Sequence, residues 1–184
     1  NEDRVKNSLH VHSLYLYDKA FYQELGEIAE YLNLPIQMHL AETTVEVETI
    51  KERFQMTPVE LLRHTNLLRD GSLYAHCVHL TGHDLDILKG RNVTLVHNPA
   101  SNGKLASGIL DAEPIETRGI RLALGTDGAG SNDSLNMFSD LRLALFLQKL
   151  LHKNPQAADE SRWLYNSTTS GYEALGFPEM AEFR

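Results

Sequence analysis

The amino-acid sequence predicts an α/β fold, a TIM-like (β/α)8 barrel of which its 184 residues supply one part. Short apolar runs alternate with longer amphipathic runs, which is the pattern of parallel strands joined by helices. Four of the apolar runs close on a histidine or an aspartate, and polar side chains at strand ends are typical of a barrel's active face. No glycine-rich phosphate motif follows the first run, which disfavours an open nucleotide-binding sheet.

Five strands and the helices between them can be placed along the sequence. Strands are expected at 9–16, 35–40, 73–78, 93–97 and 121–125. Helices are expected at 18–32, 44–54, from 57 onward, at 81–88, near 115, at 137–151 and at 161–175. Asp18 is a cap for the first helix, and Thr57-Pro58-Val59-Glu60 has the threonine, proline and glutamate of a capping box. The first helix carries an apolar stripe on one face: Phe21, Leu25, Ile28 and Leu32.

Composition excludes several classes of function. The formal net charge is -8 without a run of lysine or arginine, which argues against a nucleic-acid partner. No stretch approaches the roughly 20 apolar residues of a membrane span, so no membrane association is expected. Cys77 is the single cysteine, which excludes a disulfide scaffold and a cysteine-rich zinc site. A cytoplasmic protein acting on a small molecule is the default expectation.

The residues that close the strands indicate one metal-dependent hydrolytic site. Three strand-like runs lead to His39, His76 and His97, and the run 121–125 leads into Thr126-Asp127-Gly128. Asp127 follows a run too apolar to tolerate a free charge, so a metal ion or a histidine partner is expected beside it.

His39-Leu40-Ala41-Glu42 combines a metal-ligand type with a proton carrier. A neutral imidazole binds zinc, and a glutamate that is not a ligand can move protons beside the metal. Taken alone the pattern is weak, and a surface acid next to a buried structural histidine is the alternative. Of the two histidines in His76-Cys77-Val78-His79, His76 is expected in the site, His79 is expected to cap or pack, and Cys77 is expected to face the helices.

The segment 97–105 is expected to form a long polar loop. Its side chains either bind a ligand or satisfy the backbone of the loop, and the second alternative is favoured because they are ordinary turn residues. The polar side chains concerned are Asn98, Ser101, Asn102 and Lys104.

Together these motifs resemble the amidohydrolase superfamily, in the chlorohydrolase and deaminase branch that includes methylthioadenosine/S-adenosylhomocysteine deaminases. The resemblance extends from the strand that bears His12 to Ala174-Leu175-Gly176. It rests on motifs in the family's order and near its spacing: His39-Leu40-Ala41-Glu42-Thr43, Ala75-His76-Cys77-Val78-His79-Leu80, His97-Asn98-Pro99-Ala100-Ser101-Asn102-Gly103-Lys104-Leu105 and Gly125-Thr126-Asp127-Gly128-Ala129-Gly130-Ser131-Asn132.

The resemblance implies a role for each of five residues. His39 matches a metal ligand on barrel strand five, and Asp127 matches the strand-eight aspartate that binds the metal and helps to deprotonate its water. Glu42 matches the proton-shuttling glutamate, and His76 the strand-six histidine that orients the water or the tetrahedral intermediate. His12 matches a strand-four histidine that contacts substrate, as Glu42 and His76 also do. The family has proline before that histidine, where this chain has Val11.

The resemblance also implies the reaction. Metal-bound hydroxide attacks a ring carbon that bears an amino group, Glu42 carries the proton, and ammonia leaves. The cofactor implied is one divalent ion, zinc by preference with iron as an alternative. The substrate implied is an adenosine-like N-heterocycle. A triazine-type chlorohydrolase, or another C–N hydrolase on the same barrel, is the second enzymatic interpretation.

Residues 1–184 are expected to be the C-terminal part of such a barrel, roughly strands four to eight. The family's strand-one His-x-His pair has no counterpart at its place, because His10-Val11-His12 lies only about two dozen residues before His39. The first strands and a small β-sandwich are therefore expected to be absent. The remainder of its own barrel is then a required partner, and a homo-oligomer stays open. Alone, the fragment is expected to be inactive, and a catalytically silent barrel module is the third interpretation.

Overall fold

The computed structural model describes residues 5–181 of the chain. Its strands are β1 (Leu9–His10), β2 (Ile36–Leu40), β3 (Leu73–His76), β4 (Thr94–His97) and β5 (Arg121–Leu124). Its α-helices are α1 (Lys19–Tyr31), α2 (Thr44–Phe54), α3 (Pro58–His64), α4 (Gly82–Leu88), α5 (Pro99–Lys104), α6 (Glu113–Thr117), α7 (Ala129–Asn132), α8 (Met137–Leu151), α9 (Glu160–Ser167) and α10 (Thr169–Ala174), and a 3-10 helix, η2, spans Pro178–Met180. None of the helices between residues 5 and 181 is long and apolar enough to cross a lipid bilayer.

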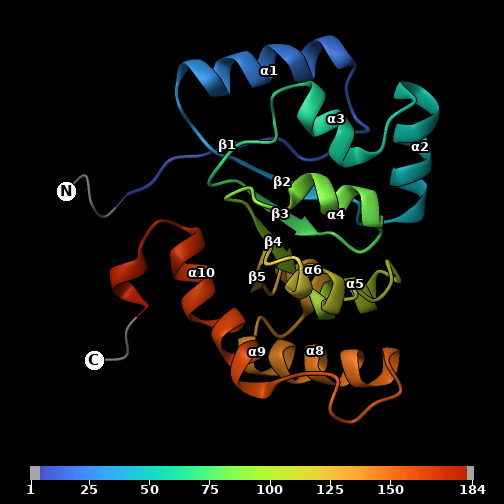
Figure 1. The fold of residues 1–184 in the computed structure, drawn as a ribbon, viewed down its shortest axis with the longest axis vertical. Helices are drawn as coiled ribbons and strands as arrows, with labels where there is room; N and C mark the ends of the chain where they lie inside the picture. The colour runs from blue at the N-terminus through green and yellow to red at the C-terminus, as the bar shows by residue number, and fades with distance from the viewer. Residues whose placement is uncertain (1–4, 182–184) are drawn as a thin grey trace.

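The five strands form one parallel sheet whose spatial order equals their order in the sequence. Helices accompany the row of strands, with α1 at the β1 end and α8, α9 and α10 at the β5 end (Figure 1). In this register His39 lies opposite Ala75, and Ala75 lies opposite Val96. Such a succession is that of consecutive strands in a (β/α)8 barrel, so the predicted fold class is confirmed.

Burial alternates along β2. Ile36, Met38 and Leu40 are buried, whereas Gln37 and His39 between them are only half-buried. Because successive strand residues point to opposite faces, one face of the sheet packs against the helices and the other stays partly open. The open face borders a cavity of ≈ 240 Å³ whose lining includes Gln37 and His39.

The first helix begins where the sequence predicts, but its core face is not the expected apolar stripe. Asp18 accepts a hydrogen bond from the backbone amide of Phe21 at 2.9 Å and caps α1. The buried residues are Tyr22, Gly26 and Ala29, while Phe21, Ile28 and Leu32 are exposed. A Cβ atom on Gly26 would lie 1.9 Å from the carbonyl oxygen of Thr65, so this close backbone approach decides which face packs.

Three elements differ from the expected ones. The first strand is Leu9–His10 instead of 9–16, because a turn at 14–17 follows it. The expected helix 161–175 is divided into α9 and α10 at Thr168, whose φ of -133° and ψ of -89° are not helical. The serine Ser170 then donates to the carbonyl of Leu122 at 2.7 Å, which ties α10 to β5.

The third difference lies in the segment 97–105, where Pro99–Lys104 form the short helix α5 instead of a polar loop. Pro99 occupies the first turn, where its missing N–H has no intrahelical partner to lose. The carbonyl of Asn98 accepts the amide of Asn102 at 2.9 Å, which closes the turn. This helix has direct consequences for the site, since it orients Ser101 and Asn102.

Candidate active site

Left-handed backbone marks the ends of three strands. Ala41 after β2, His76 and Cys77 at the end of β3, and Asp127 after β5 have φ values of 48°, 71°, 55° and 62°. Such conformations cost a non-glycine residue on the order of 1–3 kcal/mol and persist only where the surrounding structure fixes them. They cluster at functional sites, and here two of them, His76 and Asp127, are predicted site residues, while Ala41 directly precedes a third, Glu42.

Three of the predicted histidines lie in a row. The ring centroids of His12 and His39 are 4.5 Å apart, and those of His39 and His76 are 5.3 Å apart with nearly parallel planes. The Nδ1 atom of His39 lies 2.7 Å from the carbonyl oxygen of His12. Since a carbonyl only accepts, the hydrogen of the neutral imidazole is on Nδ1 and the lone pair is on Nε2, the arrangement in which a histidine binds a metal through Nε2.

His76 is also held through its Nδ1 atom, in this case by a side chain. Its Nδ1 atom lies 2.7 Å from Oδ1 of Asn102 on α5, and the side chain is buried. Its Nε2 atom lies 3.9 Å from Oε2 of Glu42. That separation is too long for a direct hydrogen bond, so the two groups lie close together without being paired.

Glu42 is fixed by a contact with the loop that follows α5. Its Oε1 atom accepts a hydrogen bond from the hydroxyl of Ser107 at 3.1 Å. The Ser107 carbonyl in turn accepts from Nε2 of His79 at 2.7 Å. His79, expected to cap or pack, therefore holds the segment that binds Glu42.

The Asp127 carboxylate accepts three hydrogen bonds. Its Oδ2 atom accepts from the hydroxyls of Ser101 at 2.6 Å and Ser131 at 2.8 Å, and Oδ1 accepts from the amide of Gly128 at 2.7 Å. Burial pushes the pKa of Asp127 upward, but the hydrogen bonds outweigh it and hold the pKa below its ordinary value. The carboxylate stays ionised at neutral pH and suits a cation.

Two buried side chains support the Asp127 loop. Asn132 donates to the carbonyl of Thr126 at 2.8 Å and to the Oδ2 atom of Asp140 at 2.9 Å. The Oδ1 atom of Asp140 accepts the amide of Ala100 on α5 at 3.2 Å. The carboxylate of Asp140 thus joins α5 to the loop after β5, the two segments that supply Ser101 and Asp127.

His97 is the strand-end histidine that does not join the site. It is fully buried against Trp163, and neither ring nitrogen has a hydrogen-bond partner among residues 5–181. Burial, with a smaller effect of the nearby His76, lowers the pKa of His97 to about 3. A neutral imidazole sealed in the core is structural, so the expectation that all four strand ends serve one site is corrected for this residue.

Two of the described residues have the chemistry of metal ligands. Within residues 5–181, no group of three or more histidine, cysteine, aspartate or glutamate side chains is arranged to hold a metal ion. His39 offers a free imidazole nitrogen and Asp127 an ionised carboxylate. Zinc takes four ligands in tight sites, and the chemistry of His39 and Asp127 suits two of them.

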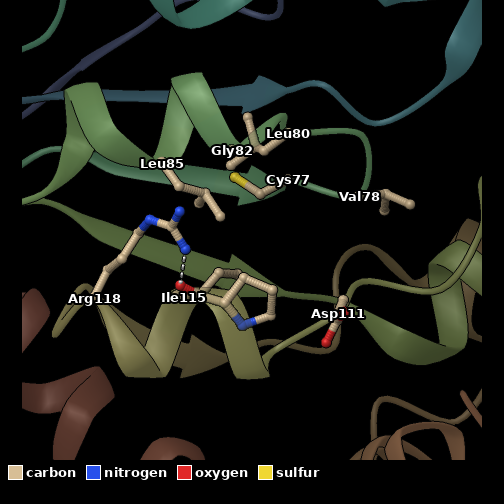
Figure 2. A pocket seen from close by; sticks show the side chains of 9 residues that line it. Cys77, Val78, Leu80, Gly82, Leu85, Asp111, Ile115 and Arg118 are labelled. Carbon is tan, nitrogen blue, oxygen red and sulfur yellow. Dashed lines mark hydrogen bonds between the residues drawn. The ribbon is translucent and has the colours of Figure 1, made fainter. Parts of the chain in front are cut away.

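A cavity of ≈ 410 Å³ lies away from these residues, between α4 and α6. Figure 2 shows Cys77, Leu85 and Ile115 around it, with the Arg118 guanidinium donating to the backbone carbonyl of Pro114. Cys77 faces the helices, as expected from the sequence. Burial holds the pKa of its thiol well above the usual range, so the thiol stays protonated and unreactive.

Four residues that hold the site were not assigned a function from the sequence. Ser101 and Asn102 were weighed as ligand or loop residues, and the structure shows that they bind Asp127 and His76. Ser107 and the buried Glu46 hold Glu42 and its backbone. The one available signal for Glu46 was its place three residues after Thr43, as in a capping box.

The sequence model of the Amidohydrolase family matches residues 1–181. The chain is 39% identical over 174 residues to a 5-methylthioadenosine/S-adenosylhomocysteine deaminase of Acetivibrio thermocellus, covering 95% of this chain and 40% of that protein. It is 36% identical over 176 residues to a 5'-deoxyadenosine deaminase of Methanocaldococcus jannaschii, covering 95% of this chain and 42% of that protein.

The structure superimposes on the crystal structure of an adenosine deaminase from Xanthomonas campestris with bound zinc. The TM-score is 0.87 at 33% identity, over 93% of this chain and 39% of that one. The chain thus spans about two fifths of the length of the relatives it matches. On the family match, these identities and this superposition, the chain belongs to the amidohydrolase family.

Proposed function

We propose that this chain is part of a metal-dependent hydrolase that deaminates an adenosine-like N-heterocycle, such as methylthioadenosine or S-adenosylhomocysteine, and releases ammonia. The observation that carries the proposal is the convergence of Glu42 and His76 at 3.9 Å beside the stacked ring of His39. Relatives named as deaminases of such nucleosides support it.

Residues 1–184 are proposed to form roughly strands four to eight of the barrel. The proposal rests on the parallel order of the five strands and on the length of the relatives. The activity then belongs to a protein that also contains the remaining strands, with further metal ligands on them. A cytoplasmic location is part of the same proposal.

His39 and Asp127 are the residues proposed to hold a divalent ion, zinc by preference. His39 directs a free lone pair from Nε2, and Asp127 supplies a carboxylate that its hydrogen bonds keep ionised. When bound, such an ion supplies hydroxide at neutral pH, because it lowers the pKa of water to about 7.

Glu42 is proposed to move protons at the heterocycle. Ser107 occupies Oε1, so Oε2 is the oxygen that faces His76 and is free to take a proton and pass it to a ring nitrogen. His76 carries its hydrogen on Nδ1, toward Asn102. Its Nε2 atom therefore accepts a hydrogen bond from the hydroxyl that forms on the substrate. His12, at the end of the histidine row, is proposed to contact the substrate.

The test is a screen of products from the full-length protein. Adenosine, methylthioadenosine, S-adenosylhomocysteine and guanine are each assayed for ammonia, and chlorinated and alkylamino triazines for chloride and alkylamine. Ammonia from a purine supports the proposal, and chloride or alkylamine from triazines supports the alternative hydrolase. If none of the substrates releases ammonia, chloride or alkylamine, both the deaminase and the triazine hydrolase are contradicted. The catalytically silent barrel is then the remaining interpretation.

A further inference from the structure

Three helices of this chain begin with the same pattern, a threonine followed three residues later by an acid. In α3 the Glu60 carboxylate accepts the amide of Thr57 at 2.8 Å, and in α4 the Asp84 carboxylate accepts the amide of Thr81 at 2.9 Å. Both are complete capping boxes, in which the acid satisfies the amide of the capping residue.

The third helix, α2, departs from the other two. The Thr43 hydroxyl caps it by accepting the amide of Glu46 at 3.1 Å. The Thr43 amide lies close enough to lower the pKa of the Glu46 carboxyl, but no capping box forms, because the two hydrogen bonds of this carboxylate go elsewhere. It accepts the amide of Ala41 at 3.0 Å through Oε1 and the amide of Glu42 at 2.8 Å through Oε2. The acid thus binds the two residues before the cap.

The burial of Glu46 fits this different role. Its exposed fraction is 5%, and burial raises its pKa in spite of the backbone hydrogen bonds. Ala41, which it binds, has a left-handed φ of 48°. Burial alone does not set Glu46 apart, because Asp84 in the capping box of α4 is also buried and Glu60 in that of α3 is half-buried. What distinguishes Glu46 is the pair of amides that it binds. Its two acceptor oxygens instead match two consecutive amides that a left-handed turn directs to one point.

We propose that Glu46 is a positioning residue, which fixes the backbone of Ala41 and Glu42 and so aims the Glu42 carboxylate at His76. Glu42 is then held twice, through its backbone by Glu46 and through Oε1 by Ser107. Only Oε2 remains directed toward His76. The proposal rests on the proposed function, because the position of the Glu42 carboxylate matters to the reaction only if Glu42 carries the proton.

The first readout is independent of activity. The variant Glu46→Gln keeps the shape of the side chain but places an amide donor against a backbone donor. Hydrogen exchange in the full-length protein is expected to speed up at least tenfold at residues 41 and 42. The control Glu60→Gln makes the same chemical change in the capping box of α3, and faster exchange is expected at Thr57 alone. Unchanged exchange at residues 41 and 42 in Glu46→Gln overturns the proposal.

The second readout is ammonia release, measured where both variants are folded by circular dichroism. A displacement of about 1 Å can cost on the order of 10²-fold in rate, so kcat of Glu46→Gln is expected to fall about 10- to 100-fold. KM and bound metal stay at the wild-type level, and Glu60→Gln keeps wild-type kcat. If hydrogen exchange at residues 41 and 42 becomes faster in Glu46→Gln while kcat stays unchanged, the positioning role is overturned. A wild-type protein without ammonia release contradicts the proposed function, while the exchange result still decides whether Glu46 holds the loop.

Discussion

Nδ1 of His76 lies 2.7 Å from Oδ1 of Asn102, and this contact determines which nitrogen of the histidine faces Glu42. The amide oxygen accepts, so in the neutral imidazole the hydrogen is on Nδ1 and the lone pair is on Nε2, which faces Glu42. The residue that sets this tautomer lies on α5, a helix that was expected to be a loop. The neighbouring Ser101 binds Asp127 from the same helix.

Replacing Asn102 by alanine is expected to lower kcat/KM for ammonia release about 10- to 100-fold, the usual effect of removing a partner that orients an active-site histidine. Asn102→Asp keeps an acceptor for Nδ1 and is expected to retain more activity than Asn102→Ala. Steady-state kinetics of both variants check this. Equal kcat/KM for wild type and Asn102→Ala would show that the tautomer is set elsewhere.

Removing the hydroxyl of Ser101 is expected to make metal retention more sensitive to acid. The hydrogen bond from Ser101 lowers the pKa of Asp127, so Ser101→Ala raises this pKa. A proton then competes with the metal for the carboxylate at a higher pH. Metal content measured between pH 4 and 7 is expected to fall at a higher pH than in the wild type. The exposed Ser139→Ala on α8 is the control, and coincident curves for all three proteins contradict the expectation.

His97 is expected to weaken the fold in acid. Burial lowers the pKa of His97 to about 3 from an ordinary value of 6.5. Between these values the unfolded chain binds a proton that the folded chain does not, so stability rises with pH across this window and is lost as pH falls from 6.5. The loss approaches about 1.4 kcal/mol per pH unit.

The variant His97→Leu removes this titration and the two unpaired ring nitrogens. Urea unfolding at pH 7 and pH 5 is expected to show that the wild type loses about 2 kcal/mol more than the variant over this interval. An equal loss in both proteins would mean that His97 is protonated in the folded state.

The close contact at Gly26 predicts a large effect of a small substitution. A Cβ atom would lie 1.9 Å from the carbonyl oxygen of Thr65, so Gly26→Ala must displace α1 and is expected to cost about 2 kcal/mol or more. Gly103→Ala is the matched control on α5, because a Cβ there meets no atom of the described residues within 4 Å. It is expected to be neutral or to stabilise by up to about 1 kcal/mol. Thermal unfolding of both variants checks the pair, and similar melting temperatures contradict it.

The sequence predicts the parallel sheet because each strand is a short apolar run with its own boundary residues. The segment around α5 was misassigned because asparagine, serine and glycine are typical of turns, and contacts with Asp127 and His76 from other elements give them their place. The core face of α1 could not be predicted either, because Gly26 packs there against the backbone of Thr65, which lies 39 residues later in the sequence.

The residues of the candidate site could likewise be predicted only in part. His39, Glu42, His76 and Asp127 could be proposed from residue type and position at strand ends. The side chains that orient them could not, because a serine or a buried glutamate looks the same in sequence whether it faces water or a neighbouring loop. His97 illustrates the converse, since a strand-end histidine with the same local pattern is buried in the core.

The most direct test of the proposed metal-dependent deaminase is to measure ammonia release from methylthioadenosine against bound metal in the full-length protein. The protein is stripped with a chelator and reloaded with increasing zinc, in parallel with His39→Ala and Asp127→Ala. Ammonia release is expected to rise in proportion to bound metal up to one ion per chain. Both variants are expected to bind far less zinc and to release far less ammonia than the wild type. Full ammonia release from the metal-free protein, or none from the loaded protein, would contradict the account.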